Sequence, residues 1–374
     1  MRMKLNFFIN SLGGGGAEKV LVDLVNQLPK DKFEITVTTL LHGIHDSKLA
    51  SHIQHKCIIN TTNKLLSALL MRIYCKLLPL RVFAWLFLKD NDHVIISYLE
   101  GFNTRVLAKY KGPAKRVAFV HCNTGVHNDW INSYASLNDC LHQYKTFNRV
   151  CFVSTDALEG FQKVVGHLDN ASVVHNVIDF RAAVEKSREA INLPATILPK
   201  DGIKLISVGR LTPIKGFDRL INVVSRLRDD NIECSLIICG EGTSRSELEK
   251  QVITLGLDNV YFLGFQENPY KFMAMADIYV CSSYSEGYST SVSESIALGV
   301  PVLTTDCSAM SEILGNGAYG DIVDNTEDGL YVGAKNMITN SEHLALLKTK
   351  VGNRSRELLS INPVQEYIDL FDKL

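Results

Sequence analysis

The residues with the clearest capacity for chemistry lie between positions 285 and 302. Glu286 and Glu294 are separated by eight positions in the run Ser-Glu-Gly-Tyr-Ser-Thr-Ser-Val-Ser-Glu. The apolar segment 276–283 before them predicts a short buried strand. Residues 290–298, which are followed by Gly299 and Pro301, predict a helix. Glu286 is then expected in the loop at the carboxyl end of the strand, and Glu294 about one turn into the helix.

The start of this helix predicts an anion site. The first backbone N–H groups of a helix have no partner inside the helix, and they attract phosphate. Gly287, Tyr288, Ser289 and Thr290 occupy this start, where they could hold the sugar and phosphate of a ligand. Because the flanking carboxylates accept hydrogen bonds from hydroxyl groups, a sugar nucleotide fits the pattern. The alternative is a helix cap beside a solvated glutamate.

A second segment supports a phosphate ligand. The apolar strand predicted over 203–208 leads into Gly-Arg-Leu-Thr-Pro-Ile-Lys-Gly, and a helix is expected from Phe217. Arg210 and Lys215 therefore lie on a strand-to-helix loop, at the edge of a parallel sheet where ligands bind. A planar guanidinium and a compact ammonium together suit a diphosphate. The alternative is a pair of ordinary surface cations.

Four motifs then occur in a fixed order. They are Gly-Arg-Leu-x-x-x-Lys-Gly at 209–216, Gly-Glu-Gly at 240–242, Leu-Gly-Phe at 263–265, and Glu-x7-Glu followed by Ala-Leu-Gly-Val-Pro-Val. Over about residues 200–315 the chain resembles the retaining glycosyltransferases of family four (group 1), of the kind that build bacterial surface polysaccharides. The resemblance is weaker over the first 180 residues. It implies an α/β fold of the GT-B type, with two Rossmann-like doubly wound parallel-sheet domains facing a central cleft.

The resemblance also implies roles for these residues. Arg210 and Lys215 would bind the donor diphosphate in place of a divalent ion, Glu294 the ribose hydroxyls, and Glu286 the sugar hydroxyls. Same-face attack, with the leaving phosphate taking the acceptor proton, requires no side-chain nucleophile. Further donor contacts are expected at Gly209, Gly240 and Phe265.

Two features of the first half belong to the same expected site. Four glycines at 13–16 follow the first predicted strand and open a helix, so that backbone can approach a ligand closely. The resemblance implies that Gly15 and Gly16 face the donor diphosphate; the alternative is a flexible turn. His121 ends the strand predicted over 116–120, and the resemblance implies a place near the reacting sugar. The alternative is a core or capping histidine.

Alternation of strand-like and helix-like segments predicts parallel sheets with crossover helices. Strands are expected near 4–10, 34–40, 93–98, 116–120, 149–153 and 171–175, and then near 203–208, 233–239, 259–263, 277–281 and 301–304. We expect an N-terminal acceptor- and membrane-binding domain over 1–180 and a C-terminal donor domain over 181–360. Residues 176–202 are expected to form the hinge, and the resemblance implies that the helix in 361–374 returns to the first domain.

Charge is divided unevenly along the chain. Residues 1–180 carry a net charge of +6 and residues 181–374 one of −7, while the window 47–116 carries +9. Within that window, cations interrupt the apolar run 64–89 every few residues and a proline breaks it, which disfavours a spanning helix. Two short basic amphipathic helices on an anionic membrane fit better. Arg72, Lys76 and Arg81 would lie on lipid phosphates, and leucines, Phe83 and Trp85 would be inserted. The alternative is that their apolar faces pack on the domain's own sheet. Nucleic acid is a weaker interpretation, because the whole chain is near neutral.

Composition predicts a cytoplasmic protein that needs no metal. Nine cysteines without a Cys-x-x-Cys pair indicate reduced thiols. The basic and apolar start is too short for a secretory signal, so we expect a first strand there. No His/Cys/Asp/Glu group has metal-ligand spacing. The Asp-x-Asp pattern at 90–92 is expected to be a turn, because it precedes a strand rather than ending one.

Together these features predict a retaining, metal-independent glycosyltransferase on the inner face of the cytoplasmic membrane. It would move a hexose or N-acetylhexosamine from a nucleotide diphosphate sugar, with uridine as the commoner base, to a lipid-linked saccharide in capsule, O-antigen or exopolysaccharide synthesis. Two alternatives stay open. One is a soluble transferase acting on a small acceptor, and the other is a non-catalytic sugar-binding protein with two hinged domains.

Overall fold

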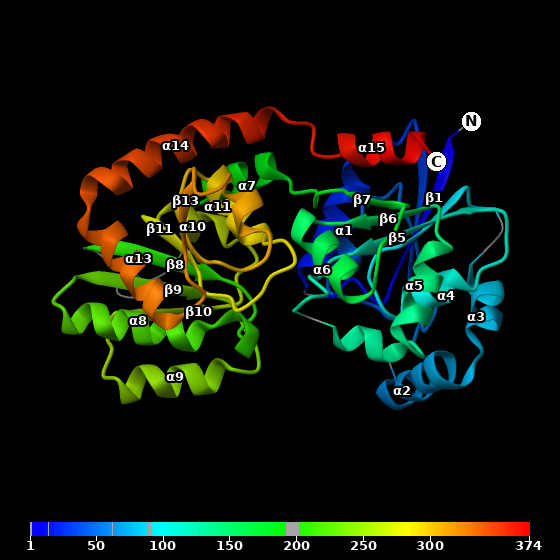
Figure 1. Cartoon of the computed structure of the whole chain (residues 1–374), viewed down its shortest axis with the longest axis horizontal. Helices are drawn as coiled ribbons and strands as arrows, with labels where there is room; N and C mark the ends of the chain where they lie inside the picture. The colour runs from blue at the N-terminus through cyan, green and yellow to red at the C-terminus, as the bar shows by residue number, and fades with distance from the viewer. Residues whose placement is uncertain (1, 14, 62, 89–90, 127, 192–201) are drawn as a thin grey trace. The chain divides into compact units, whose positions relative to one another are not determined.

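The computed structural model describes residues 2–13, 15–61, 63–88, 91–126, 128–191 and 202–374. The chain divides into two compact units (Figure 1). Unit 1 comprises residues 1–178 together with Asn362–Leu374, and unit 2 comprises Asp179–Ile361. Each unit contains one parallel sheet with helices on its faces, so the predicted α/β class with two doubly wound domains is confirmed.

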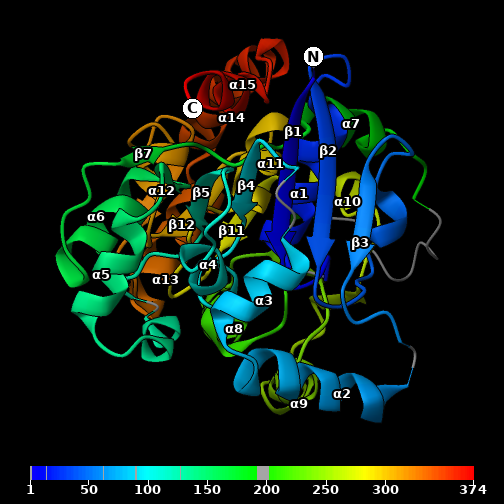
Figure 2. The same ribbon diagram turned by 90° about the vertical axis from the view of Figure 1, so that its right-hand side faces the viewer.

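The sheet of unit 1 has the strand order β3-β2-β1-β4-β5-β6-β7, and all pairs are parallel. The strands are β1 Met3–Ile9, β2 Phe33–Thr39, β3 Gln54–Cys57, β4 Val94–Ser97, β5 Lys115–Val120, β6 Arg149–Phe152 and β7 Ala171–Val173. Figure 2 shows β1, β2 and β3 side by side. The last five residues of β1 are all buried, because helices cover both faces of a parallel sheet.

Two apolar clusters hold the helices of unit 1 against this sheet. Helices α1 and α15 pack on one face, and α3, α4, α5 and α6 on the other. The helices are α1 Gly16–Gln27, α2 Lys64–Arg72, α3 Leu80–Phe87, α4 Phe102–Ala108, α5 Leu137–Lys145, α6 Thr155–Val164 and α15 Gln365–Asp372. Shorter turns are η1 Asp46–Lys48, the π-helical η2 Ile73–Leu77, and η3 Asp129–Ser133.

Unit 2 has the strand order β10-β9-β8-β11-β12-β13, again entirely parallel. The strands are β8 Ile203–Val208, β9 Cys234–Cys239, β10 Val260–Gly264, β11 Ile278–Cys281, β12 Val302–Thr305 and β13 Gly320–Val323. The helices are α7 Phe180–Ser187, η4 Pro213–Lys215, α8 Phe217–Asp229, α9 Arg245–Thr254, α10 Tyr270–Ala274, α11 Thr290–Ala297, α12 Met310–Ile313, α13 Glu327–Thr339 and α14 Ser341–Ser360. Apolar side chains of α8, α9 and α13 pack on one face, and those of α7, α10, α11 and α14 on the other.

The structure corrects three expectations about elements. Strands β3 and β13 were missed, because the residues of β3 are polar and those of β13 only partly buried. The expected hinge over 176–202 is not a simple linker, since it contains α7. Ala183 of that helix is buried in the core of unit 2. The rest of that expected hinge, 192–201, lies outside the described residues.

The last helix, α15, belongs to unit 1 although it is the last element of the chain. Phe371 is buried with its ring centroid 6.2 Å from that of Phe7 and 5.9 Å from that of Phe33. At the helix start, the Glu366 carboxylate accepts a hydrogen bond from the backbone N–H of His175 at 3.0 Å. Residues separated by most of the chain therefore share one core.

Candidate functional site

The strand orders locate the ligand-binding edge of each unit. In a doubly wound sheet, ligands bind beyond the carboxyl ends of the two strands at which the order reverses. In unit 2 these strands are β8 and β11, which lie side by side. Lys215 follows β8, and Glu286 follows β11. Lys215 and Glu286, for which the sequence analysis predicted the same ligand, therefore lie at the switch point of unit 2.

The structure brings Lys215 and Glu286 into direct contact. The Lys215 ammonium lies 2.6 Å from Oε1 of Glu286, and both side chains are largely buried. Burial alone would lower the pKa of Lys215, but the Glu286 carboxylate outweighs it and holds the pKa above its ordinary value of 10.5. Ser283 Oγ also donates to Glu286 Oε1 at 2.6 Å. A charged lysine and an oriented carboxylate are therefore ready at this edge.

Backbone packing fixes the loop that carries Lys215. Gly216 has φ +62°, and a Cβ there would lie 2.2 Å from the Ser282 carbonyl oxygen. Only glycine fits this approach. Ser282 Oγ donates to the Lys215 carbonyl at 2.9 Å. The guanidinium of Arg219, 3 % exposed, donates to the Ser282 carbonyl from Nε at 2.9 Å and Nη2 at 2.6 Å. The β8 and β11 loops are thereby joined into one rigid edge.

A small polar pocket lies beside the ion pair. Its volume is about 10 Å³, and its lining includes Ser207, Lys215, Tyr279, Glu286 and Ser291. That volume corresponds to roughly one water molecule. The pocket is therefore too small to hold a sugar.

The start of α11 has the geometry expected of an anion site, while Glu294 has a partner that the sequence did not indicate. Ser289 occupies the cap position of α11, but its side chain makes no capping hydrogen bond. Glu294 is only 4 % exposed, and its Oε1 accepts a hydrogen bond from the Tyr270 hydroxyl at 3.0 Å. Tyr270 therefore orients the carboxylate assigned to the ribose.

The other predicted donor residues of unit 2 lie on the same sheet edge. Arg210 is exposed directly after β8, and Phe265, 63 % exposed, follows β10. Gly209 and Gly240 are in backbone contact, since a Cβ on Gly240 would lie 1.9 Å from the Gly209 carbonyl oxygen. The two glycines thus let the β8 and β9 loops approach closely. Gly287, Tyr288 and Thr290 lie between Glu286 and α11 or at its first position.

In unit 1 the predicted residues follow β1, which is one of the two strands at that unit's switch point, and β5. Gly15 precedes α1, and a Cβ there would lie 2.0 Å from the Glu18 carboxylate, whereas Gly16 has open space. His121 follows β5, and its backbone N–H donates to Glu100 at 3.0 Å. Its ring centroid lies 4.8 Å from that of Tyr98.

His121 has the properties of a neutral hydrogen-bonding residue. Burial lowers its pKa to about 3. Its Nε2 is buried without a hydrogen-bond partner among the residues that the structure describes. A neutral imidazole with an unused nitrogen can bind a sugar hydroxyl, but it is a weak base.

Four contributors to the edge of unit 2 were missed by sequence reasoning: Arg219, Tyr270, Tyr279 and Ser283. Tyr279 donates its hydroxyl to Ser291 Oγ at 2.8 Å, beside the start of α11. The contacts of these four residues form only in the folded chain. Only Ser283, three positions before Glu286, carried a local signal.

The basic window forms a partly exposed helical layer on unit 1. Helix α2 has no buried residue, and α3 buries Phe83 and Ala84 while Trp85 is 78 % exposed. Phe83, which was expected to insert into lipid, instead packs in the core of unit 1, so that expectation is wrong. The packing alternative holds for this face of α3, and membrane binding of the exposed face stays a prediction. Arg72, Lys76 and Arg81 are exposed. Further exposed apolar residues of the layer are Leu65, Leu66, Leu69, Leu77, Val82 and Leu86.

A pocket opens where this layer meets the turn after α4. It has a volume of about 380 Å³, and its lining includes Arg81, Trp85, Lys109 and Lys111. Three cations around an aromatic ring suit an anionic headgroup. Over the described part of the chain, no helix is both long and apolar enough to span a membrane.

The sequence analysis did not identify one group of potential metal ligands. It found no group with metal-ligand spacing, yet the fold brings His42, Asp46 and His55 of unit 1 together. Asp90 of the Asp-x-Asp pattern lies outside the described residues, and Asn91 is in a turn.

Comparison with known proteins identifies what unit 2 is similar to. Residues 193–353 match the family model of the glycosyl transferases group 1. The matched residues lie within the second unit. The chain is therefore a glycosyltransferase, and the resemblance stated from its motifs is confirmed.

Relatives extend the similarity to the whole chain. One is the N-acetylgalactosamine-N,N'-diacetylbacillosaminyl-diphospho-undecaprenol 4-alpha-N-acetylgalactosaminyltransferase of Campylobacter jejuni, 27% identical, with 94% of this chain and 95% of the relative covered. Another is the lipopolysaccharide core biosynthesis glycosyltransferase LpsE of Rhizobium meliloti, 26% identical, with 92% and 91% covered.

A solved structure supports the GT-B fold of this glycosyltransferase. The Anabaena protein HepE in complex with UDP and glucose aligns with a TM-score of 0.78 at 18% identity. The alignment covers 100% of this chain and 99% of HepE. At that identity the likeness concerns the fold alone.

Proposed function

We propose that this glycosyltransferase moves a hexose or N-acetylhexosamine from a UDP-sugar to a lipid-linked saccharide, with retention and without a metal ion. The observation that carries the proposal is the Lys215–Glu286 pair at the switch point of unit 2, 2.6 Å apart and next to the start of α11. This edge offers a cation for a diphosphate and a carboxylate for sugar hydroxyls at one place.

The transfer step would depend on stabilising the leaving group. When the sugar–phosphate bond breaks, negative charge develops on the diphosphate oxygen. Lys215, Arg210 and the N–H groups at the start of α11 would stabilise that charge. Glu286 would orient the sugar, and Glu294, held by Tyr270, would accept from the ribose. The leaving phosphate would take the acceptor proton, so no side-chain nucleophile is assigned.

The layer formed by α2, η2 and α3 supports a lipid-linked acceptor. It presents Trp85 and exposed leucines beside Arg72, Lys76 and Arg81. Such a surface fits peripheral binding to anionic lipid on the inner face of the cytoplasmic membrane. The name of the Campylobacter jejuni relative describes transfer to an undecaprenol-diphosphate-linked saccharide. That chemistry is the acceptor class we propose here, in the assembly of a surface polysaccharide.

The test is an activity assay of the full chain in which each donor is combined with each acceptor. UDP-N-acetylgalactosamine, UDP-N-acetylglucosamine, UDP-glucose and GDP-mannose are each offered with a polyprenyl-diphosphate saccharide, a sugar phosphate or water. Nucleotide release is measured with chelator present, and the anomeric configuration of the product by NMR. We expect chelator-insensitive release from one UDP-sugar with the lipid-linked acceptor and an α-linked product.

Other outcomes separate the alternatives. Transfer only to the sugar phosphate would favour the soluble transferase with a small acceptor. Binding of nucleotide sugars without turnover on any acceptor would favour the non-catalytic binding protein. An inverted anomer would refute retention.

A further inference from the structure

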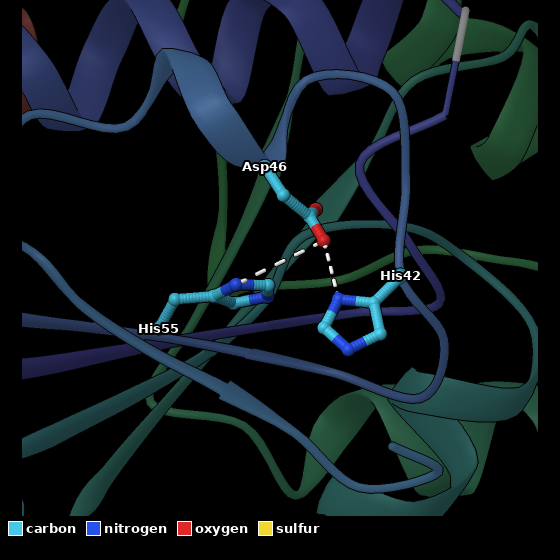
Figure 3. Close-up of side chains that lie close together, drawn as sticks. All are labelled: His42, Asp46 and His55. Atoms are coloured by element: carbon cyan, nitrogen blue, oxygen red, sulfur yellow. Dashed lines mark hydrogen bonds and ion pairs between the residues drawn. The ribbon is translucent and has the colours of Figure 1, made fainter. Parts of the chain in front are cut away.

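The connection between β2 and β3 contains a second group of side chains suited to a ligand. Oδ2 of Asp46 lies 2.7 Å from Nδ1 of His42 and 3.9 Å from Nδ1 of His55. Figure 3 shows both imidazole rings directed at this one carboxylate, from the loop after β2 and from the edge strand β3. The three ligand atoms lie within 4.8 Å of one another.

We propose that His42, Asp46 and His55 bind a divalent transition metal of the Zn²⁺ type, which joins the loop after β2 to strand β3. Two imidazole nitrogens and one carboxylate oxygen form a donor set that such ions prefer. Around a tetrahedral zinc, ligand atoms lie roughly 3.3 Å apart, given bonds of about 2.0–2.1 Å. The observed separations bracket that value, and His42, on a loop and half exposed, is free to adjust.

The surroundings of the two rings support metal binding through Nδ1. Nε2 of His42 lies 3.0 Å from Oδ1 of Asn60, and Nε2 of His55 lies 3.0 Å from Oγ1 of Thr39. In the structure Nδ1 of His42 donates to Asp46 at 2.7 Å, and a metal would take the place of that proton. Each outer nitrogen could then donate to its oxygen while Nδ1 binds the metal. Metal-binding histidines are held by outer hydrogen bonds of this kind.

The Asp46 carboxylate also has an oxygen that can accept a further interaction. Its Oδ1 is buried and has no hydrogen-bond partner among the described residues. An unpaired buried carboxylate oxygen is costly, and a cation bound by both oxygens of Asp46 would remove that cost. With three protein ligands, a fourth position would be left for water.

The expected consequence of metal binding is a stiffer support for the glycine-rich loop. The backbone N–H of His45 donates to the Leu12 carbonyl at 3.0 Å, and a Cβ on Gly43 would lie 2.1 Å from the same oxygen. Leu12 directly precedes the glycines at 13–16. The metal would order this part of unit 1 and take no part in the transfer step, which we assign to a metal-free donor edge in unit 2.

The matched control is another His–Asp pair of unit 1. Nε2 of His167 lies 3.2 Å from Oδ1 of Asp169, but the described residues provide no third ligand of the His/Cys/Asp/Glu type there. His167→Ala therefore removes an exposed histidine with a carboxylate beside it and leaves the proposed site intact.

The experiment titrates the chelator-treated full chain with Zn²⁺ by calorimetry. We expect one Zn²⁺ per chain, affinity weakened by at least about a hundredfold in His42→Ala and His55→Ala, and unchanged affinity in His167→Ala. His42 is half exposed, so its variant is expected to fold even if the His55 variant does not. Zn²⁺ should also slow hydrogen exchange at the backbone N–H groups of His45 and Ile58, which bond to Leu12 and Thr39.

Substitution of Co²⁺ separates this site from the nine cysteines. A cobalt spectrum without a thiolate charge-transfer band would support nitrogen and oxygen ligands, whereas a thiolate band would overturn the assignment. Equal affinity in His42→Ala and wild type, or no stoichiometric Zn²⁺ binding at all, would also overturn it.

Discussion

At the scale of single residues, the central question is how Lys215 can pair with Glu286 and also with a donor diphosphate. In the structure its ammonium is 2.6 Å from Glu286. A bound diphosphate brings more negative charge to the same ammonium, and Glu286 then becomes available to sugar hydroxyls. The pair would thus keep both groups oriented until the donor arrives.

Replacing Lys215 by alanine tests this role. The variant loses a charge-assisted contact to the leaving group, which corresponds to about 2–4 kcal/mol in the transition state, or roughly 30- to 1000-fold in kcat. Steady-state nucleotide release measures the loss. Lys250→Ala, which removes an exposed lysine of α9 in the same unit, should leave the rate unchanged. Turnover of Lys215→Ala within threefold of wild type would exclude Lys215 from the site.

Variants of Glu294 and Glu286 should separate UDP binding from sugar transfer. Glu294→Gln keeps the shape of the side chain but loses charge-assisted acceptance from the ribose, so UDP binding should weaken by about 1–3 kcal/mol. Glu286→Gln should leave UDP binding nearly unchanged and reduce transfer. Calorimetry with UDP and turnover with the UDP-sugar measure both effects. Unchanged UDP affinity in a folded Glu294→Gln variant would place the ribose elsewhere.

His121 leads to a prediction about pH. Its pKa of about 3 lies far below its ordinary 6.5, so the imidazole is neutral at every pH above that lowered value. Between about pH 5 and 8, where an ordinary histidine changes charge, His121 should contribute no change in rate. His121→Asn should lower kcat, yet leave the shape of the pH–rate profile unchanged. An acid limb near pH 6.5 that disappears in this variant would contradict the neutral role.

At the scale of elements, α15 shows how the end of the chain supports the first unit. Phe371→Ala should destabilise unit 1 by about 3–5 kcal/mol, because a fully buried ring between Phe7 and Phe33 is lost. Urea unfolding followed by circular dichroism measures the shift of that unit's transition. Phe265→Ala, which truncates an exposed ring of unit 2, is the control for stability. Equal midpoints for the two variants would show that α15 is dispensable to the core.

Elements with a local signal were predictable, and those fixed by distant contacts were not. Apolar runs and glycine-bounded loops located β8, β11 and α11 within a residue or two. Strand β3 was missed, because an edge strand of polar residues has no apolar pattern to recognise.

The same distinction holds for the candidate site. The shared place of Lys215 and Glu286 could be predicted from their loops. Tyr270 is 24 positions from Glu294, and no sequence pattern indicates their hydrogen bond. The cluster of His42, Asp46 and His55 was invisible for the same reason. It depends on the pairing of β2 with β3, which the sequence did not predict.

At the scale of the whole molecule, the division of charge predicts where it meets a membrane. The net charge is +6 over 1–180 and −7 over 181–374, so the first part should face anionic lipid. Replacing Arg72, Lys76 and Arg81 together with glutamate changes the charge by −6 on an exposed surface. Each lost cation removes about 1 kcal/mol of attraction, and the added carboxylates are repelled. Binding to anionic vesicles, measured by sedimentation, should fall by at least about a hundredfold.

A charge-matched control separates this surface from net charge. Lys250, Lys350 and Arg356 are exposed cations of unit 2, and their replacement by glutamate gives the same change of −6. That variant should keep vesicle binding, because only charges within about a Debye length of the lipid contribute. In the first variant, transfer to a lipid-linked acceptor should drop while slow donor hydrolysis in solution persists, since the donor edge is unaltered. If both variants bind vesicles as the wild type does, or if the wild type never binds them, the exposed layer of α2 and α3 is not a membrane surface. A small soluble acceptor then becomes the better explanation of the site.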